Sequence, residues 1–213
     1  MLNEYKKDKF LSSFIINENT KSKTNFDFQQ LSDFETYEEM EEYCDANLRK
    51  LGEGSSRAVY VIGDGTRAVK IALNDAGIDQ NENEIKWGYK TEFAGDILAE
   101  IFDYGDDASW LLVETALPLK EKNFQKAVGY PMTWLRQYLI YEKHKAPISN
   151  KILKALEDDE FANTLADFMF ETSAPAGDLS KVDSFGVVHR NGKNAIVLID
   201  YGLSDKILRS HYL

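Results

Sequence analysis

The chain has 213 residues, 36 of them acidic and 25 basic, and a formal net charge of -11. This length fits one domain, and 43% hydrophobic residues can build a sizeable core, which argues against a disordered chain. The acidic balance argues against a nucleic-acid binder, and no apolar run is long enough to span a membrane. The single cysteine excludes an internal disulfide, and the N-terminus lacks the apolar core of a secretion signal, so we expect a cytoplasmic protein.

The first segment, residues 1–32, is polar, and we expect it to be a loosely ordered arm. Residues 33–45 contain seven carboxylates and no basic residue, so this stretch carries -7 of the net charge of -11. Thr36 and Glu39 match a capping box, and apolar residues recur there at helical spacing, which predicts an amphipathic helix over 36–48. A solvated helix face is a more frequent explanation of such carboxylates than an acidic docking surface.

From residue 51 on, short apolar runs separated by turn residues predict a sheet. The strongest hairpin signal is Gly63-Asp64-Gly65-Thr66, which lies between two such runs. In chain order we expect strands at 58–62 and 67–72, a helix at 79–93, and strands at 97–102 and 109–114. Helices should follow through 119–171, with breaks at 129–131 and near 147. A final hairpin should pair 185–189 with 195–199.

Two glycines precede the first strand in the segment Leu51-Gly52-Glu53-Gly54-Ser55-Ser56-Arg57-Ala58-Val59-Tyr60. Glycines let backbone N–H groups approach a phosphate chain, although an isolated Gly-x-Gly is more often an ordinary turn. On the next strand Lys70 shares a face with Ala68, from which the lysine would reach nucleotide phosphates while the alanine leaves room for a flat base. The lysine needs an anionic partner, for which we prefer Glu84 to the alternative Glu82.

Three further carboxylates follow in the second half of the chain. Asp178 and Asp183 lie five residues apart, and Asp200 follows an apolar strand in the sequence Asp200-Tyr201-Gly202. If these carboxylates converge, they repel one another unless a cation lies between them. Mg²⁺ and Mn²⁺ are bound by oxygen ligands, and such an ion would bind phosphate oxygens as well as the carboxylates. The pattern therefore predicts a divalent metal site.

In this order, the motifs resemble those of the protein-kinase-like superfamily over about residues 48–204. The resemblance implies an α+β, two-lobed fold within a single domain at 33–213. An antiparallel-sheet N-lobe with a helix would cover about 48–115. A reduced and mainly helical C-lobe, truncated soon after Asp-Tyr-Gly, would cover about 119–213.

The resemblance also implies roles for individual residues and a need for ATP with Mg²⁺ or Mn²⁺. Val113 falls near the gatekeeper position, and Glu114 begins the hinge. The implied catalytic residues are Lys70, Glu84 and Asp178, and the implied metal ligands are Asp183 and Asp200. The implied nucleotide contacts are Gly52, Gly54, Ser55, Arg57, Val59, Ala68, Lys70, Val113 and Glu114.

Several positions depart from the family's pattern. Arg57 stands where the third loop glycine is usual, and it would cover or contact phosphates or else face solvent. The sequence Ala176-Gly177 replaces His-Arg, so coupling to a phosphorylated activation loop should be absent. Ser180 stands at the catalytic-loop lysine, for which Lys181 is a candidate substitute. Asp183 replaces the usual Asn, which keeps an oxygen ligand and adds a charge.

Two narrower resemblances concern the second half of the chain. Gly177-Asp178-Leu179 resembles the motif of aminoglycoside-phosphotransferase-type kinases. The short segment 203–213 after Gly202, together with the acidic helix, resembles small phage-encoded kinase-like proteins, which would act in the host cytoplasm. A competing alignment through His189-Arg190-Asn191 is rejected, because it would place a metal ligand at Ile196 in mid-strand.

These observations lead us to expect ATP-dependent transfer of the γ-phosphoryl group to a protein hydroxyl, on Ser or Thr rather than Tyr. The expected partners are ATP and a protein substrate that the sequence does not identify, with neither nucleic acid nor membrane involved. One alternative is a pseudokinase-like module that binds nucleotide and acts through a protein partner. A small-molecule kinase and a nucleotidyl transferase are further alternatives.

Overall fold

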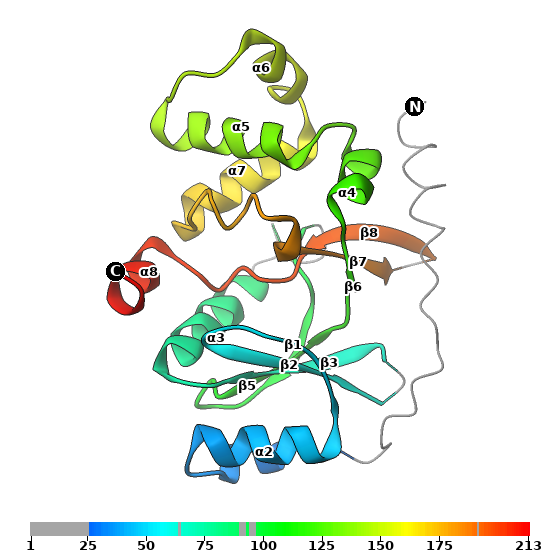
Figure 1. Cartoon of the computed structure of the whole chain (residues 1–213), viewed down its shortest axis with the longest axis vertical. Coiled ribbons are helices and arrows are strands. Elements are labelled where there is room, and N and C mark those ends of the chain that lie inside the picture. The colour runs from blue at the N-terminus through cyan, green and yellow to red at the C-terminus, as the bar shows by residue number, and fades with distance from the viewer. Residues whose placement is uncertain (1–25, 64, 90–92, 94–96, 191) are drawn as a thin grey trace.

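A computed structural model of the chain shows a mixed α and β protein (Figure 1). It describes residues 26–213 apart from 64, 90–92, 94–96 and 191. An antiparallel sheet with a helix against it forms the N-lobe, and a mainly helical C-lobe follows, with a small second sheet between them. This arrangement confirms the expected α+β fold class. Across the described part of the chain, no helix is long and apolar enough to cross a membrane.

The N-lobe sheet contains five strands, all paired antiparallel, in the order β1-β2-β3-β5-β4. These strands are β1 (Arg49–Glu53), β2 (Arg57–Ile62), β3 (Arg67–Ala72), β4 (Ile101–Tyr104) and β5 (Trp110–Glu114). The predicted hairpin of β2 and β3 is confirmed, and its register places Val59 opposite Lys70. The strand expected from residue 97 begins only at Ile101, because Leu98 forms a parallel bridge with Leu198 of the second sheet.

Helix α2 (Tyr37–Asn47) packs on one face of this sheet, as the capping box and the apolar spacing predicted (Figure 1). The Thr36 hydroxyl accepts a hydrogen bond from the backbone N–H of Glu39 at 3.2 Å and so begins the helix. Met40 and Cys44 are buried in a cluster with Trp110 of β5. Glu38, Glu39 and Glu42 of the acidic stretch are exposed. Two other carboxylates of α2 contact the sheet, because Glu41 lies 2.9 Å from the Lys50 ammonium and Asp45 accepts a hydrogen bond from the Tyr60 hydroxyl at 2.8 Å.

The expected N-terminal arm, residues 1–32, is described only from residue 26 onward. Its last residues pack on the same sheet face as α2, in the short 3₁₀ helix η1 (Gln29–Asp33). Leu31 is fully buried, and the Ser32 hydroxyl accepts a hydrogen bond from the Trp110 indole at 2.9 Å. Residues 26–32 thus contribute to the N-lobe core, and the expectation for the rest of the arm lies outside the described residues.

Helix α3 (Asp75–Gly88) lies against the opposite face of the sheet (Figure 1). It was expected over 79–93 and begins earlier, because Asn74 caps it by accepting a hydrogen bond from the N–H of Gly77 at 3.2 Å. Part of the expected C-terminal end, residues 90–92, lies outside the described residues.

The C-lobe confirms the predicted helical region and both of its breaks. Its helices are α4 (Glu121–Val128), α5 (Met132–His144), α6 (Asn150–Leu156) and α7 (Glu160–Thr172). Gly129 ends α4 in the left-handed conformation with φ 95°, and Pro131 precedes α5. A third break before α7 was not predicted. There the Asp159 carboxylate caps α7 by accepting a hydrogen bond from the N–H of Ala162 at 2.9 Å.

The small second sheet pairs β6 (Leu117–Pro118), β7 (Phe185–Arg190) and β8 (Lys193–Leu198) in that order. The final predicted hairpin is confirmed, with Arg190 opposite Lys193. In the turn between β7 and β8, Asn191 lies outside the described residues and Gly192 has φ 75°. A 3₁₀ helix, η2 (Val182–Ser184), leads into β7, and an unpredicted helix, α8 (Asp205–His211), follows the Asp-Tyr-Gly sequence.

Candidate active site

Lys70 of β3 and Glu84 of α3 form a buried ion pair at the inner face of the N-lobe sheet. The lysine Nζ lies 2.7 Å from Glu84 Oε2 and also donates a hydrogen bond to the backbone oxygen of Ile199 at 2.6 Å. Glu84 is fully buried, whereas Glu82 is exposed on the same helix. The preferred pairing of Lys70 with Glu84 is therefore present. Burial lowers the pKa of Lys70 below its usual value even though Glu84 acts to raise it.

The inner face around this pair is apolar and small. Ala68 and Val113 are buried there, and Val59 packs against them. Because strand side chains alternate, Val69 and Ile71 point to the opposite face and contact the core beneath α2. The expected nucleotide contacts Val59, Ala68 and Val113 thus lie together on the face that carries Lys70, as the alternation predicted.

Arg57 of β2 is a second buried cation at the same place. Its Nη1 lies 2.7 Å from Glu84 Oε1, and its Nη2 donates a hydrogen bond to the carboxylate of Asp200. Only 8% of Arg57 is exposed, so it points inward rather than into solvent. Partial burial would raise the pKa of Asp200, but the positive charges of Arg57 and Lys70 outweigh it and leave that pKa below its usual value.

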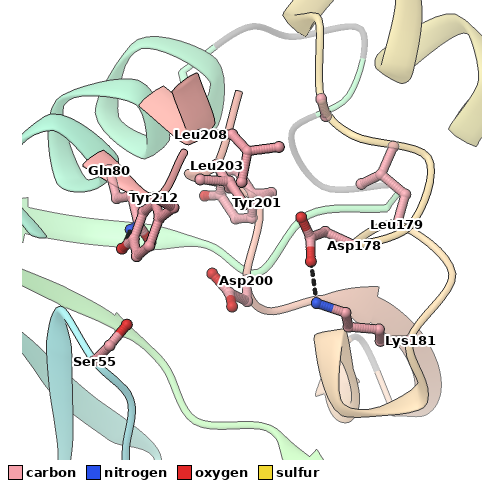
Figure 2. Close-up of a pocket in the computed structure, with 11 residues that line it drawn as sticks. Ser55, Gln80, Asp178, Leu179, Lys181, Asp200, Tyr201, Leu203, Leu208 and Tyr212 are labelled. Carbon is pink, nitrogen blue, oxygen red and sulfur yellow. Dashed lines mark hydrogen bonds and ion pairs between the residues drawn. The ribbon is translucent and has the colours of Figure 1, made fainter. Parts of the chain in front are cut away.

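Asp178 and Asp200 line one cavity of about 270 Å³ between the N-lobe and the C-lobe (Figure 2). Asp178 comes from the loop after α7 and forms an ion pair with Lys181, and Asp200 lies in the segment that follows β8. Ser55, from the glycine-rich segment, also lines this cavity. The structure therefore brings together three of the predicted site residues from distant parts of the chain.

Asp183 lies apart from this group. It is exposed on η2 and is not among the residues that line the cavity. Within the described ranges, no three His, Cys, Asp or Glu side chains are grouped closely enough to hold a metal ion. The expected convergence of Asp178, Asp183 and Asp200 is therefore not observed. The physical reason is that Lys181 and Arg57 already neutralise the other two carboxylates, so no shared cation is required to bring the three together.

The donor set nevertheless fits Mg²⁺ in company with a nucleotide. Mg²⁺ is commonly bound through one or two carboxylates, with phosphate oxygens and waters completing its octahedron. Asp200 and Asp178 supply carboxylate oxygens at one cavity, and the side chain of Asp200 is 57% exposed and thus accessible. To bind a metal through both oxygens, Asp200 must exchange its contact with Arg57.

The glycine-rich segment forms the turn between β1 and β2. Gly52 lies opposite Val59, and the N–H of Gly54 donates to the backbone oxygen of Arg57 at 2.9 Å. A Cβ added to Gly52 would meet no protein atom within 4 Å. Protein packing therefore does not require a glycine at position 52. The space next to its backbone is free of protein atoms, so a ligand can approach it.

Glu114, the expected start of the hinge, is engaged in an ionic contact. The Arg190 Nε lies 3.1 Å from both of its carboxylate oxygens, and the Arg190 guanidinium also donates to the backbone oxygen of Leu98 at 2.8 Å. Arg190 was not among the predicted site residues. No local pattern identifies it, because the contact joins strands of the two different sheets.

Gly202 of the Asp-Tyr-Gly sequence is required by close packing. A Cβ at this position would lie 2.4 Å from the backbone oxygen of Gln80 in α3. We expect Gly202→Ala to lower the free energy of unfolding by about 1–3 kcal/mol, because the backbone of α3 must shift. Gly177→Ala is the matched control, since its added Cβ would meet nothing within 4 Å.

Urea unfolding of both variants measures the difference. The Gly177 variant should stay within about 0.5 kcal/mol of the parent protein, as is usual for surface substitutions. Equal and small effects of the two alanines would contradict the close packing of Gly202 against α3.

Comparison with known proteins adds little to this geometry. No protein-family model and no curated protein matches the sequence. Two solved structures of the PknI kinase domain from Mycobacterium tuberculosis, one of a point mutant, are similar to this chain at 14% sequence identity, with TM-scores of 0.36 and 0.32. Each match covers 75% of this chain and 60% of the kinase domain, so the chain spans less than two thirds of the proteins it matches. At these TM-scores, the similarity carries no argument about activity.

Proposed function

We propose that this protein is an ATP-dependent phosphotransferase that transfers the γ-phosphoryl group to a protein hydroxyl, with Ser or Thr as the expected residue. One observation carries the proposal: the buried pair of Lys70 and Glu84 lies beside Asp200, which shares a cavity with Asp178. A lysine held by a buried glutamate, two carboxylates and an open glycine-rich turn are the parts that phosphoryl transfer requires.

Each part has a chemical role in this proposal. Lys70 holds the α- and β-phosphates, and Glu84 keeps its ammonium aimed. The N–H groups near Gly52 and Gly54 approach the phosphate chain, and the apolar inner face receives the base. Asp178 accepts the proton of the acceptor hydroxyl.

The proposed metal ligand at the cavity is Asp200; the family pattern also implies Asp183, which does not line the cavity. A bound Mg²⁺ would supply positive charge to the phosphate oxygens. The charges of the site support such a requirement. Among the described residues, the three cations of the site, Lys70, Arg57 and Lys181, are matched by the carboxylates of Glu84, Asp200 and Asp178, so these six side chains offer no surplus positive charge to a triphosphate.

A second candidate function is a nucleotide-binding module that acts through a protein partner. The observation that favours it is the internal pairing of both cavity carboxylates, Asp178 with Lys181 and Asp200 with Arg57. If these pairs persist with nucleotide bound, neither Asp178 nor Asp200 is free to accept a proton or bind a metal.

The decisive experiment is incubation of the full chain with Mg²⁺ and ATP labelled at either the γ- or the α-phosphate, in buffer and in cell lysate. Transfer of γ-label alone to protein, and at least about a hundredfold less with Asp178→Asn, is the expected result. Transfer of α-label would instead assign nucleotidyl transfer. ATP binding in calorimetry without either label would favour the binding module. Transfer of γ-label to small metabolites alone would indicate a small-molecule kinase.

A further inference from the structure

The helix α8 brings a tyrosine hydroxyl to the cavity that contains Asp178 and Asp200. Tyr212 follows the last turn of α8 and lines this cavity with both carboxylates (Figure 2). Its hydroxyl accepts a hydrogen bond from the Gln80 side chain at 2.8 Å and contacts the hydroxyl of Ser56 in the glycine-rich segment. The tyrosine therefore lies next to the turn that the proposed function places over the phosphates.

Polar contacts at both ends of α8 hold Tyr212 in this position. At the start of the helix, Asp205 pairs with Lys143 of α5 at 2.8 Å. At its end, the His211 ring lies 2.7 Å from a carboxylate oxygen of Asp79 in α3. Ile207 is buried between these contacts, with 7% of its surface exposed. Contacts to both lobes thus fix α8 beside the cavity.

Of the residues that line the cavity, three carry a hydroxyl: Ser55, Tyr201 and Tyr212. Tyr201 is buried, and its hydroxyl donates to the backbone oxygen of Ala99 at 3.2 Å. Ser55 belongs to the turn that would pack on the phosphates. Tyr212 is 40% exposed and comes from outside that turn, so it is the acceptor that the geometry favours.

We propose that Tyr212 is an intramolecular phosphoryl acceptor of this protein, an inference that rests on the proposed function. The Tyr212 oxygen attacks the γ-phosphorus of ATP and forms a new O–P bond. The bond between the γ-phosphorus and the bridging oxygen breaks, and ADP leaves with that electron pair. The phenolic proton passes to the carboxylate of Asp178, so the atoms and charges balance. The protein would then phosphorylate a tyrosine of its own chain in addition to any Ser or Thr of a separate protein substrate.

The modification has a structural consequence. A phosphate on Tyr212 adds about -1.5 to -2 charges near neutral pH. This charge would lie at a cavity that already contains Asp178 and Asp200, and like charges repel. The contacts of Tyr212 with Ser56 and Gln80 would be lost, and α8 would leave the cavity.

The test uses the full chain, first treated with phosphatase and then incubated with Mg²⁺ and ATP. Peptide mass spectrometry should find one phosphate on the fragment containing Tyr212, formed at a rate that does not depend on protein concentration. Hydrogen exchange of 205–213 should become faster as the phosphate accumulates. Tyr212→Phe should abolish this phosphate, whereas Tyr104→Phe, at a residue of similar exposure (37%) away from the cavity, should leave it unchanged.

The remaining outcomes separate this inference from the proposed function. If γ-label reaches other hydroxyls, Ser55 included, while Tyr212 stays unmodified, the inference fails and the proposed function stands. A rate proportional to protein concentration would overturn the intramolecular step. Phosphate on Tyr212 at an undiminished rate in Asp178→Asn would overturn the assigned proton acceptor. If calorimetry detects no ATP binding and no label appears, the proposed function fails and the inference fails with it.

Discussion

Replacing Glu84 with glutamine is expected to lower the free energy of unfolding by about 3–5 kcal/mol, the cost of removing one partner from a buried ionic group. Glu84 is fully buried, and each of its carboxylate oxygens lies 2.7 Å from a buried cation, Lys70 on one side and Arg57 on the other. A neutral amide would leave both cations without a full counter-charge. Arg57 retains a contact with Asp200, but the other contacts of Lys70, with the backbone oxygen of Ile199 and the Tyr201 ring, carry no full negative charge.

Thermal or urea unfolding of the variant measures this effect, and Glu82→Gln provides the matched control. The control changes the same residue type on the same helix, at an exposed position. It should shift stability by less than about 0.5 kcal/mol. If both variants lowered the free energy of unfolding by the same small amount, the ion pair of Lys70 with Glu84 would not contribute to the stability of the N-lobe. Glu84→Gln should also weaken ATP binding at temperatures where the protein remains folded, because the ammonium of Lys70 loses its orientation.

Asp200→Asn is expected to reduce γ-phosphoryl transfer by at least about two orders of magnitude, which corresponds to roughly 3 kcal/mol of transition-state stabilisation. The amide removes a negative charge from the proposed metal site while keeping the size of the side chain. Stability should change little, because the side chain is 57% exposed and the amide oxygen can still accept a hydrogen bond from Arg57. A large loss of activity with a small loss of stability is therefore the expected signature.

Two measurements are needed for this variant: label transfer, and Mn²⁺ binding in the presence of nucleotide. Mn²⁺ binding should weaken together with transfer, whereas Asp158→Asn, at an exposed position in the C-lobe, should alter neither. Transfer that continues at the parent rate in Asp200→Asn would exclude Asp200 as a ligand and remove the basis of the proposed site. Asp183→Asn, measured in parallel, tests the ligand that lies outside the cavity lining.

Much of the N-lobe was predictable because its signals are local. The alternation of side chains along β3 predicted that Lys70 and Ala68 share a face, and Thr36 predicted the start of α2. The start of α3 at Asn74 and the whole of α8 were missed, although both carry capping residues. We did not predict them because no long apolar stripe at helical spacing follows either capping residue.

For the candidate site, the sequence predicted which residue types occur and in which order, but not which of them come together in space. Glu84 was preferred to Glu82 without a decisive pattern, and the predicted gathering of Asp183 with the other carboxylates is absent. Neither question is answered by sequence spacing, because the angle at which α3 and η2 pack against the sheets decides which carboxylate reaches a cation.

The sequence by itself determined the order of the motifs, the alternation of the strands and the residue types available for chemistry. These features follow from neighbouring dihedral angles and turn residues, which act within a few positions of the chain. Only the tertiary structure decided that Arg57 bridges Glu84 and Asp200, that Arg190 binds Glu114, and that Tyr212 lines the cavity of Asp178. Each of these contacts joins elements distant in the chain, so its existence depends on how the two sheets and α8 pack around a common interior.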